Sequence, residues 1–543
     1  MKLSERRNES GAAIVAFLFL YLQTLSNSLP LSTKSRWIID DEGGQRVKLR
    51  CVNWVSHLEP MVAEGLEKKP LRFIARRIAA AGFNCVRFTW PTFMFTRSEY
   101  SRRTVLESLS KYNLTAAKEG IVKNNPQLLN MAVVDVHKAV VNELGKNKVM
   151  VVLDNHVSFP TWCCADADGN GFFNDRFFDP HEWLQGLSAV ATSYKNNPWV
   201  VGISLRNELR GPNQNESDWY KYMEEGAETI HVISRNLLVI ISGLSYAKNL
   251  SFLKKRPISS TYDNKLVFEA HWYSFGTSSE DWSLRTNQLC ASESASSFDN
   301  YLFLMSGDNP FPLLLSEFGA DQRGSNEADN MYIGCLMATM AEYDLDWALW
   351  TFQGSYILRQ GTVNLEEVYG VMNLNWDSLR SANFLQRLQY LMQINQQGMG
   401  NLPFNYVLFH PQSGLCVQYE HGDKITLGSC KFAAQWKKRH ANAGPIFLAR
   451  SERCLAAMGD GEAVILLKEC STDQSLWRSI SASGLHLAAK SIDGKNLCLE
   501  MDDRDATLVA RRCRCVDDDL RDVPSCNDNP QVQWFKFAPT NVV

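Results

Sequence analysis

The feature that most limits the fold of this chain is a series of short apolar segments that alternate with segments of helical periodicity. The eight apolar segments are residues 47–54, 83–90, 149–156, 199–208, 237–242, 266–273, 311–317 and 345–352. The helical spacing is found in residues 67–81, 128–144, 180–194, 218–234 and 329–343. Near-continuous apolar strands are typical of a parallel sheet that is covered on both faces. The alternation predicts a closed (β/α)8 TIM barrel with right-handed crossovers, interrupted by a polar, irregular insertion at 97–127.

The segment 199–208 shows how one of these predicted strands ends. Its apolar part is followed directly by Arg206, Asn207 and Glu208. In barrels of this kind, polar residues at the carboxyl ends of the strands form the active site. A solvated carboxylate after an ordinary strand is the alternative. The choice between them depends on whether other strands end in matching groups.

The other predicted strands do end in polar and aromatic side chains. Together with the segment 199–208 they bring eight candidate residues to one end of the barrel, namely Arg87, His156, Asn207, Glu208, His271, Tyr273, Glu317 and Trp350. Hydrolysis of a glycosidic bond needs one protonated and one ionised carboxyl, and Glu208 and Glu317 suit that pair. An arginine and a tyrosine hydroxyl near one glutamate would keep it ionised, whereas an asparagine beside the other could hold a sugar hydroxyl.

With these positions the chain resembles glycoside hydrolase family five, the large cellulase and β-mannanase family. The resemblance covers most of residues 36–400. It implies that Glu208 is the acid/base, Glu317 the nucleophile and Tyr273 the hydrogen-bond partner of the nucleophile. The residues that it implies for orienting these groups and for stacking on the sugar are Arg87, His156, Asn207, His271 and Trp350. It implies no metal and no cofactor.

Past residue 400 the helical periodicity stops, and short strand-like runs are separated by Gly, Asp and Ser turns. Two cysteines followed by a tryptophan occur three times from residue 405 onward, as Cys416, Cys430 and Trp436, as Cys454, Cys470 and Trp477, and as Cys498, Cys513 and Trp534. A unit of this length cannot bury enough surface alone, so the three units must share one core. The repeat predicts a β-trefoil domain over residues 405–543.

This second domain resembles a ricin B-type β-trefoil lectin domain. The Gln-x-Trp signature of such modules is altered in all three repeats. The position two residues after the first cysteine, where these modules often carry aspartate, is Gln418, Ala456 or Glu500. Only Glu500, with Asp502 and Asp503 near it, leaves a polar site. Both a sugar ligand on the trefoil and a purely structural module remain open.

The cysteines of the trefoil are expected to pair within repeats. The expected pairs are Cys416–Cys430, Cys454–Cys470, Cys498–Cys513 and, in an insertion of the third repeat, Cys515–Cys526. In the barrel, Cys51 and Cys85 lie within strands and are expected to be free. Cys163 or Cys164 could reach Cys290, because these residues follow strand ends on the same face.

The loop after the third strand has two interpretations. The spacing of Asp166, Asp168 and Asn170 is that of a calcium loop, but Phe177 stands where a bidentate glutamate would be needed. An ordinary turn-rich loop is therefore the favoured interpretation. The aromatic residues of this loop could either stack on a sugar or pack against the barrel rim; they are Trp162, Phe172 and Phe173.

The amino-terminal residues and the cysteine content indicate that the protein is exported from the cell. Residues 1–28 combine a basic start, an apolar run and small polar residues, which is the pattern of a signal peptide, with an uncleaved anchor as the alternative. The chain has 14 cysteines, which fit an oxidising environment, and possible glycosylation sites at Asn113, Asn215 and Asn249. We expect a secreted, extracellular protein of a cell-wall or apoplast-like setting.

The net charge of −3, with acids and bases interspersed, provides no basic field for nucleic acid and no polybasic patch for a membrane. A Gly-x-Ser-x-Gly elbow of a serine hydrolase is also missing. We interpret residues 29–400 as a retaining β-glycosidase that acts by double displacement on a poly- or oligosaccharide, a β-linked glucan, mannan or related glycoside. The alternative is an inactive carbohydrate-binding protein. We expect a monomer without stable membrane insertion.

Overall fold

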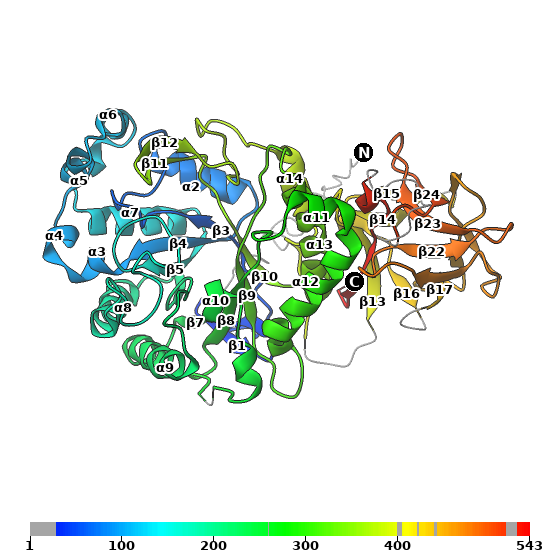
Figure 1. The fold of residues 1–543 in the computed structure, drawn as a ribbon, viewed down its shortest axis with the longest axis horizontal. Coiled ribbons are helices and arrows are strands. Elements are labelled where there is room, and N and C mark those ends of the chain that lie inside the picture. Colours follow the sequence, from blue (N-terminus) through cyan, green and yellow to red (C-terminus); the bar gives the residue numbers. More distant parts are fainter. Residues whose placement is uncertain are drawn as a thin grey trace, which may run out of the picture.

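The computed structural model describes residues 29–258, 260–398, 404–420, 423–438, 443–516 and 529–542. Its larger domain is a closed barrel of eight parallel strands (Figure 1). In barrel order from β3 they are β3 (Arg50–Trp54), β4 (Cys85–Pro91), β5 (Met150–Val157), β6 (Val200–Ser204), β7 (Leu238–Ser242), β8 (Leu266–His271), β9 (Leu313–Phe318) and β10 (Asp346–Leu349). The predicted (β/α)8 fold is confirmed. The expected signal peptide lies outside the described residues.

Helices of the barrel domain follow the strands in the chain. They are α2 (Leu71–Ala80), α3 (Thr92–Thr96), α7 (Val133–Lys146), α8 (Pro180–Tyr194), α9 (Glu216–Ile233), α10 (Leu244–Ala247), α11 (Ser279–Leu284), α12 (Thr286–Asn300), α13 (Glu327–Tyr343) and α14 (Ala382–Arg387). Helix α7 buries Val136, Val140 and Leu144 at helical spacing. Helix α8 begins at Pro180, and the Asp179 carboxylate accepts a hydrogen bond from the backbone N–H of Glu182 at 2.7 Å. Among the described helices, none is long and apolar enough to span a bilayer.

The insertion at 97–127 was predicted to be irregular, but it is helical. It contains α4 (Ser98–Ser101), α5 (Val105–Lys111) and α6 (Thr115–Asn124). Helix α5 starts with a capping box in which Thr104 and Glu107 each accept a hydrogen bond from the other's backbone N–H, at 3.1 and 2.8 Å. The prediction was wrong because these helices are short, and each buries too few apolar residues, such as Leu109 and Ile121, to give a clear helical period.

One end of the barrel is closed by an antiparallel hairpin of β1 (Leu31–Lys34) and β2 (Trp37–Asp40). Leu31 and Ile38 of this hairpin join a buried cluster with side chains from the barrel strands, such as Val152, Val201 and Ile240. The barrel is therefore a filled core and not a pore, and ligands can reach only its opposite end, where the strands terminate.

The described residues contain three disulfides in the barrel, and they correct the sequence-based expectation. Cys51 and Cys85 are not free, because the parallel register of β3 and β4 places them directly opposite each other. Cys290 on α12 is bonded to Cys335 on the neighbouring helix α13, and not to the loop after β5. The two cysteines of that loop, Cys163 and Cys164, are bonded to each other.

The carboxyl-terminal domain is antiparallel and repeats one strand pattern three times. The three units are β13 (Asn405–His410), β14 (Leu415–Tyr419), β15 (Ile425–Gly428) and β16 (Trp436–Lys438); β17 (Ala443–Leu448), β18 (Cys454–Ala456), β20 (Ile465–Leu467) and β21 (Leu476–Ser479); and β22 (Leu487–Lys490), β23 (Asn496–Met501), β24 (Leu508–Arg512) and β25 (Lys536–Thr540), with β19 (Glu462–Ala463) as an extra strand. The first strand of each unit pairs with the last strand of another, as β13–β25, β16–β17 and β21–β22.

The three units share one hydrophobic cluster, which includes Trp436 and Trp477. The disulfides predicted within the repeats are confirmed as Cys416–Cys430, Cys454–Cys470 and Cys498–Cys513. The predicted partner of Cys515, Cys526, lies outside the described residues. Each of the confirmed disulfides closes a short loop. It stabilises the small domain by lowering the conformational entropy of the unfolded chain.

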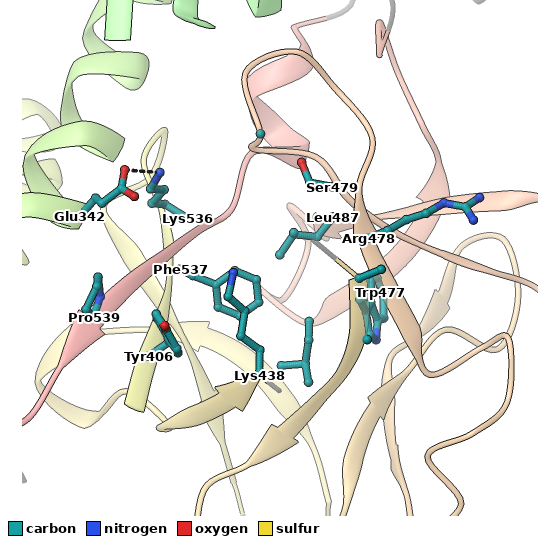
Figure 2. A pocket seen from close by; sticks show the side chains of 14 residues that line it. Glu342, Tyr406, Lys438, Trp477, Arg478, Ser479, Leu487, Lys536, Phe537 and Pro539 are labelled. Carbon is teal, nitrogen blue, oxygen red and sulfur yellow. Dashed lines mark ion pairs between the residues drawn. The ribbon is translucent and has the colours of Figure 1, made fainter. Parts of the chain in front are cut away.

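Helix α13 lies between the barrel and the carboxyl-terminal domain (Figure 1). The Gln531 side chain donates hydrogen bonds to the carbonyls of Asn330 and Met331 at 3.2 and 3.1 Å. A Cβ atom at Gly334 would lie 2.1 Å from the Gln531 amide oxygen, so only glycine allows this contact. The Lys536 ammonium pairs with Glu342 of α13 at 2.5 Å, beside a cavity of about 370 Å³ that no barrel strand lines (Figure 2).

A buried charge cluster ties the end of α13 to the closed end of the barrel. Asp344 is buried; it pairs with the guanidinium of Arg46 and, at 2.6 Å, with the ammonium of Lys48. Burial works against its ionisation, but the two cations hold the pKa of Asp344 down at about 2. Asp344 also has a left-handed backbone with φ of 51°, which asparagine tolerates well.

We predict that Asp344→Asn destabilises the barrel by about 3–5 kcal/mol, because it leaves two buried cations without a counter-charge while keeping the backbone conformation. Thermal unfolding at pH 7 measures the effect, with Asp41→Asn as the control, since that carboxylate is partly exposed. Since the folded pKa of Asp344 is depressed, wild type should lose this advantage as the pH falls from about 4 to about 2. Equal melting temperatures for Asp344→Asn and wild type would contradict the prediction.

Candidate active site

The carboxyl ends of the barrel strands open into a cleft of about 590 Å³. Six of the eight site residues predicted from the sequence line it, namely His156, Asn207, Glu208, Tyr273, Glu317 and Trp350. The other two, Arg87 and His271, lie beneath the cleft and are 0% and 1% exposed. The structure therefore brings all eight predicted residues together.

The Arg87 guanidinium lies at the centre of the site. It donates hydrogen bonds at 2.9 Å to the carboxylates of Glu317 and Asp154 and to the Asn207 amide oxygen. It also donates to Asn53 at 3.1 Å and lies 3.4 Å from the carboxylate of Glu269. A buried guanidinium is stable only when it is paired, so these contacts order the side chains around it.

Glu317, at the end of β9, has two donors. Arg87 binds one carboxylate oxygen, and the Tyr273 hydroxyl donates to the other at 3.2 Å. Burial raises the pKa of Tyr273 well above its usual value, so its hydroxyl keeps the proton that it donates. A carboxylate that receives a guanidinium and a phenol is stabilised in its ionised form.

Glu208, four residues after the end of β6, has a different environment. Its carboxyl lies 2.8 Å from the Nδ1 atom of His271. Burial lowers the pKa of His271, which leaves the imidazole neutral and without a charge to hold Glu208 ionised. Burial raises the pKa of Glu208 to about 7. It also raises that of Glu317 to about 7, despite the opposing effects of His271 and Arg87, and repulsion from Glu208 adds to the rise.

The two carboxyls are close enough to affect each other. One oxygen of Glu208, one of Glu317 and a ring nitrogen of His271 lie within 4.8 Å of one another. Two negative charges at this spacing repel, so the pair holds one proton over a wide pH range. Because Arg87 and Tyr273 donate to Glu317, we assign the negative charge to Glu317 and the proton to Glu208.

This spacing could also suit a metal ion, as could the set of Cys163, Cys164 and Glu208. The two cysteines are joined in a disulfide and so cannot supply thiolate ligands. Both oxygens of Glu317 already accept hydrogen bonds from cationic or phenolic donors. The donor set therefore fits acid–base chemistry better than metal binding.

Three further polar residues support the site, and the sequence analysis did not select them. Asp154, Glu269 and Asn53 all contact Arg87 from barrel strands. Asp154 also pairs with Nδ1 of His156 at 2.6 Å, which directs the other ring nitrogen toward the cleft and Asn207. The alternation of polar residues at the end of β5 was the signal available, since side chains two residues apart in a strand share a face.

Aromatic side chains form part of the cleft wall. Trp350 lies at the floor, with its ring 5.7 Å from that of His156, and Trp162 packs edge-on against Trp350. The Arg359 guanidinium, on the hairpin of β11 (Ser355–Arg359) and β12 (Thr362–Glu366), stacks 3.4 Å above the Trp162 ring. Phe172 and Phe173 do not reach the cleft, because both are buried in the core of the domain.

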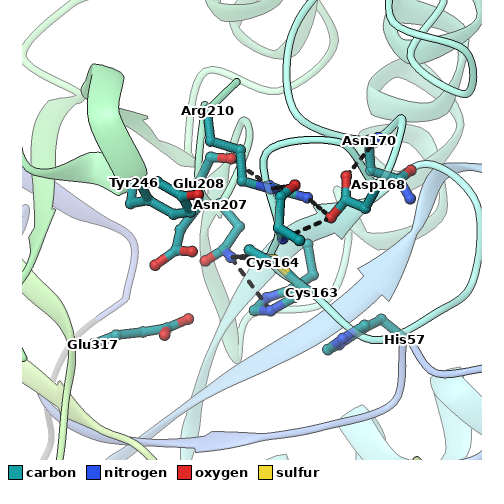
Figure 3. Close-up of a disulfide and its surroundings, with 12 residues drawn as sticks. His57, Cys163, Cys164, Asp168, Asn170, Asn207, Glu208, Arg210, Tyr246 and Glu317 are labelled. Carbon is teal, nitrogen blue, oxygen red and sulfur yellow. Dashed lines mark hydrogen bonds and ion pairs between the residues drawn. A yellow bond between two sulfur atoms is a disulfide. The ribbon is translucent and has the colours of Figure 1, made fainter. Parts of the chain in front are cut away.

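The loop with calcium-like spacing uses its polar side chains internally. Asp168 pairs with Arg210 at 2.5 Å, and Asp166 accepts a hydrogen bond from the Tyr246 hydroxyl at 2.7 Å. The Asn170 side-chain oxygen accepts hydrogen bonds from the backbone of residues 158 and 159. The Asn170 backbone N–H donates to the Asp168 carboxylate at 2.8 Å (Figure 3). These contacts explain the spacing as an ordered turn and leave the calcium interpretation without support.

A parallel barrel with two closely spaced glutamates at its open end, Glu317 buried and Glu208 partly buried, is the arrangement expected of a glycoside hydrolase. Residues 65–355 match the family described as Cellulase (glycosyl hydrolase family 5). A glycosyl hydrolase 5 family protein of Chamaecyparis obtusa is 42% identical over 542 residues, covering 97% of this chain and 96% of the relative. The chain therefore belongs to glycosyl hydrolase family 5 and is a glycoside hydrolase.

More distant proteins resemble the barrel part of the chain. An endoglucanase of Paenibacillus polymyxa is 21% identical over 302 residues, covering 52% of this chain and 69% of the relative. The solved structure of an endocellulase from Pyrococcus horikoshii matches with a TM-score of 0.55 and 16% identity, over 68% of this chain and 99% of that chain. The catalytic domain of the major endoglucanase from Xanthomonas campestris matches with a TM-score of 0.53 and 21% identity, over 67% of this chain and 99% of that chain.

We predict that Glu317→Gln lowers the pKa of Glu208 from about 7, because the substitution removes a negative charge close to that carboxyl. A carbon-13 NMR titration of protein labelled at the glutamate carboxyls measures the shift. The control is Glu119→Gln, which changes an exposed residue of α6 far from the cleft in sequence and fold. An unchanged or higher pKa of Glu208 would contradict the assignment of charges.

Proposed function

We propose that this protein is a retaining β-glycosidase that hydrolyses β-linked glucan chains with Glu208 as acid/base and Glu317 as nucleophile. The observation that carries the proposal is the spacing of the two carboxyls, whose nearest oxygens lie within 4.8 Å. Retaining enzymes hold their carboxyls at about 5–5.5 Å, whereas inverting enzymes need about 6.5–9.5 Å to admit a water. The spacing therefore favours direct attack by a carboxylate.

The first step uses the different environments of the two glutamates. Glu317 attacks the anomeric carbon, and Glu208 passes its proton to the glycosidic oxygen, so that the bond to the leaving group breaks as the bond to Glu317 forms. Arg87 and Tyr273 hold Glu317 in position by hydrogen bonds and leave its carboxylate ionised. In the second step Glu208, now ionised, removes a proton from water, which attacks the anomeric carbon and releases Glu317.

A neutral glucan fits the walls of the cleft. Trp350 and Trp162 line the cleft as apolar aromatic surface suited to the C–H groups of sugar rings, and Asn207 can bind a hydroxyl. Three relatives are named endoglucanases, and one structural neighbour of the barrel, an endocellulase from Pyrococcus horikoshii, was solved with cellotetraose. We therefore favour a β-glucan over mannan or a related glycoside as the substrate.

For the carboxyl-terminal domain we propose a ricin B-type β-trefoil with a structural role. Its one candidate polar site is occupied by the protein's own side chains, since Glu500 pairs with Arg511 and Arg514 at 3.2 Å each and accepts a hydrogen bond from Gln533 at 2.8 Å. Secretion of a monomer is part of the proposal, and the disulfides in both domains support an oxidising compartment.

The alternative is an inactive carbohydrate-binding barrel. The loss of one catalytic carboxyl, or of the residues that contact it, would be enough to abolish activity. Glu208, Glu317, Arg87, Tyr273 and His271 are all present and in contact. A chain selected only for binding has no physical need to bury two carboxyls within 4.8 Å of each other. The unfavourable free energy of placing these two carboxyls side by side is therefore better explained by a catalytic role.

We predict that Glu317→Ala and Glu208→Ala each lower kcat on a soluble β-glucan by at least about 10³-fold, because each removes half of the two-carboxyl mechanism. Azide should restore Glu317→Ala activity with formation of the α-glycosyl azide. Glu208→Ala should instead give the β-glycosyl azide, and only from substrates with good leaving groups. Reducing-sugar release and NMR of the azide products measure these outcomes.

The control for both variants is Glu119→Ala, which removes an exposed carboxyl of α6 and should keep wild-type activity. Circular dichroism and thermal unfolding verify that the inactive variants are folded. Near-wild-type activity in either catalytic variant would reject the proposal. The opposite pattern of azide products would exchange the roles of the two glutamates.

A further inference from the structure

The disulfide between Cys163 and Cys164 forms part of the cleft wall, and the two-glutamate mechanism leaves it without a role. Both cysteines line the cleft, in the loop that follows β5. Their sulfur atoms and one carboxyl oxygen of Glu208 lie within 4.8 Å of one another. Figure 3 shows the disulfide next to the Asn207 side chain, with Glu208 nearby and Glu317 beyond it.

The sulfur atoms are held in place by the residue that precedes Glu208. The Asn207 amide nitrogen lies 3.7 Å from the Cys163 sulfur and 3.8 Å from the Cys164 sulfur. The same amide lies 3.3 Å from the Nε2 atom of His156. The disulfide is therefore fixed against the group that is also expected to orient the substrate.

Arg210 fixes the rest of this loop to the strand end that carries Glu208. Its buried guanidinium donates to the Glu208 carbonyl at 2.6 Å, to the Ala165 carbonyl at 3.1 Å and to the Asp168 carboxylate at 2.5 Å. Ala165 directly follows the disulfide. Arg210 thus links the backbone next to the disulfide to the backbone of Glu208.

A disulfide offers a surface of particular chemistry. Its sulfur atoms are apolar and polarizable and carry no hydrogen-bond donor. A pyranose ring has an apolar C–H face that packs on such a surface and hydroxyls at its edges that bind polar groups. Such polar groups are present, because Asn207, Tyr246 and Lys248 line the same cleft as the disulfide.

We propose that the Cys163–Cys164 disulfide is a binding surface for the first sugar of the leaving group, whose C–H face packs on the two sulfur atoms while Glu208 protonates the glycosidic oxygen. The inference rests on the proposed function, because it takes the side of the substrate from the role of Glu208. The acid must lie beside the glycosidic oxygen, so the wall next to the acid contacts the departing sugar. No sulfur takes part in a covalent step.

The test is the double variant Cys163→Ala/Cys164→Ala with two substrates. Cellotetraose has a sugar as its leaving group, whereas β-cellobiosyl fluoride has a single atom that leaves without needing this surface. We expect KM for cellotetraose to rise about tenfold with kcat nearly unchanged, as when binding common to ground and transition state is lost. Both kinetic constants for β-cellobiosyl fluoride should stay within about twofold of wild type.

The matched control is Cys454→Ala/Cys470→Ala, which removes a disulfide of the carboxyl-terminal domain. It should leave KM and kcat for both substrates unchanged. If the first variant does not fold, Cys163→Ser/Cys164→Ser replaces it, because hydroxyls keep the volume but not the apolar surface. Unchanged KM for cellotetraose, or equal losses on both substrates, would overturn the inference. A wild-type enzyme inactive on both substrates would instead reject the proposed function.

Discussion

The structure of the site depends on the burial of one positive charge, the guanidinium of Arg87 in the middle of the barrel. A buried and unpaired cation is very unstable, so the fold must surround it with acceptors. These come from four other strand ends, as Asn53, Asp154, Asn207 and Glu317, with Glu269 slightly farther away. The same contacts that satisfy Arg87 therefore position the proposed nucleophile and the asparagine beside the proposed acid.

Side chains from β4 and from the end of β8 give the two glutamates different environments. Glu317 is buried and the Glu208 side chain is 13% exposed, and burial raises the pKa of each carboxyl. Glu317 has a guanidinium and a phenol as donors, whereas Glu208 faces a neutral imidazole. The carboxyl-terminal domain packs on α13, away from the cleft, so it can stabilise the barrel without entering the site.

The sequence predicted the barrel and its strand ends well because both depend on local patterns. Glu317 could be found because it comes two residues after the aliphatic run Leu313–Leu315, where the predicted strand ends. Asp154 was passed over because its role depends on which strand contacts Arg87. The pairing of Cys51 with Cys85 depends on the register between two strands, and a register cannot be read from either strand alone. The roles within the loop after β5 likewise depend on a distant residue, Arg210, which binds Asp168.

In the proposed mechanism Glu317 attacks the anomeric carbon directly, with no water between them. The most direct test is proton NMR of the first sugar anomer that wild-type enzyme releases from a β-linked glucan oligosaccharide, recorded before mutarotation. Two displacements at one carbon restore the original configuration, so we expect the β anomer to be released first. Release of the α anomer first would show a single displacement by water and would contradict a covalent intermediate on Glu317.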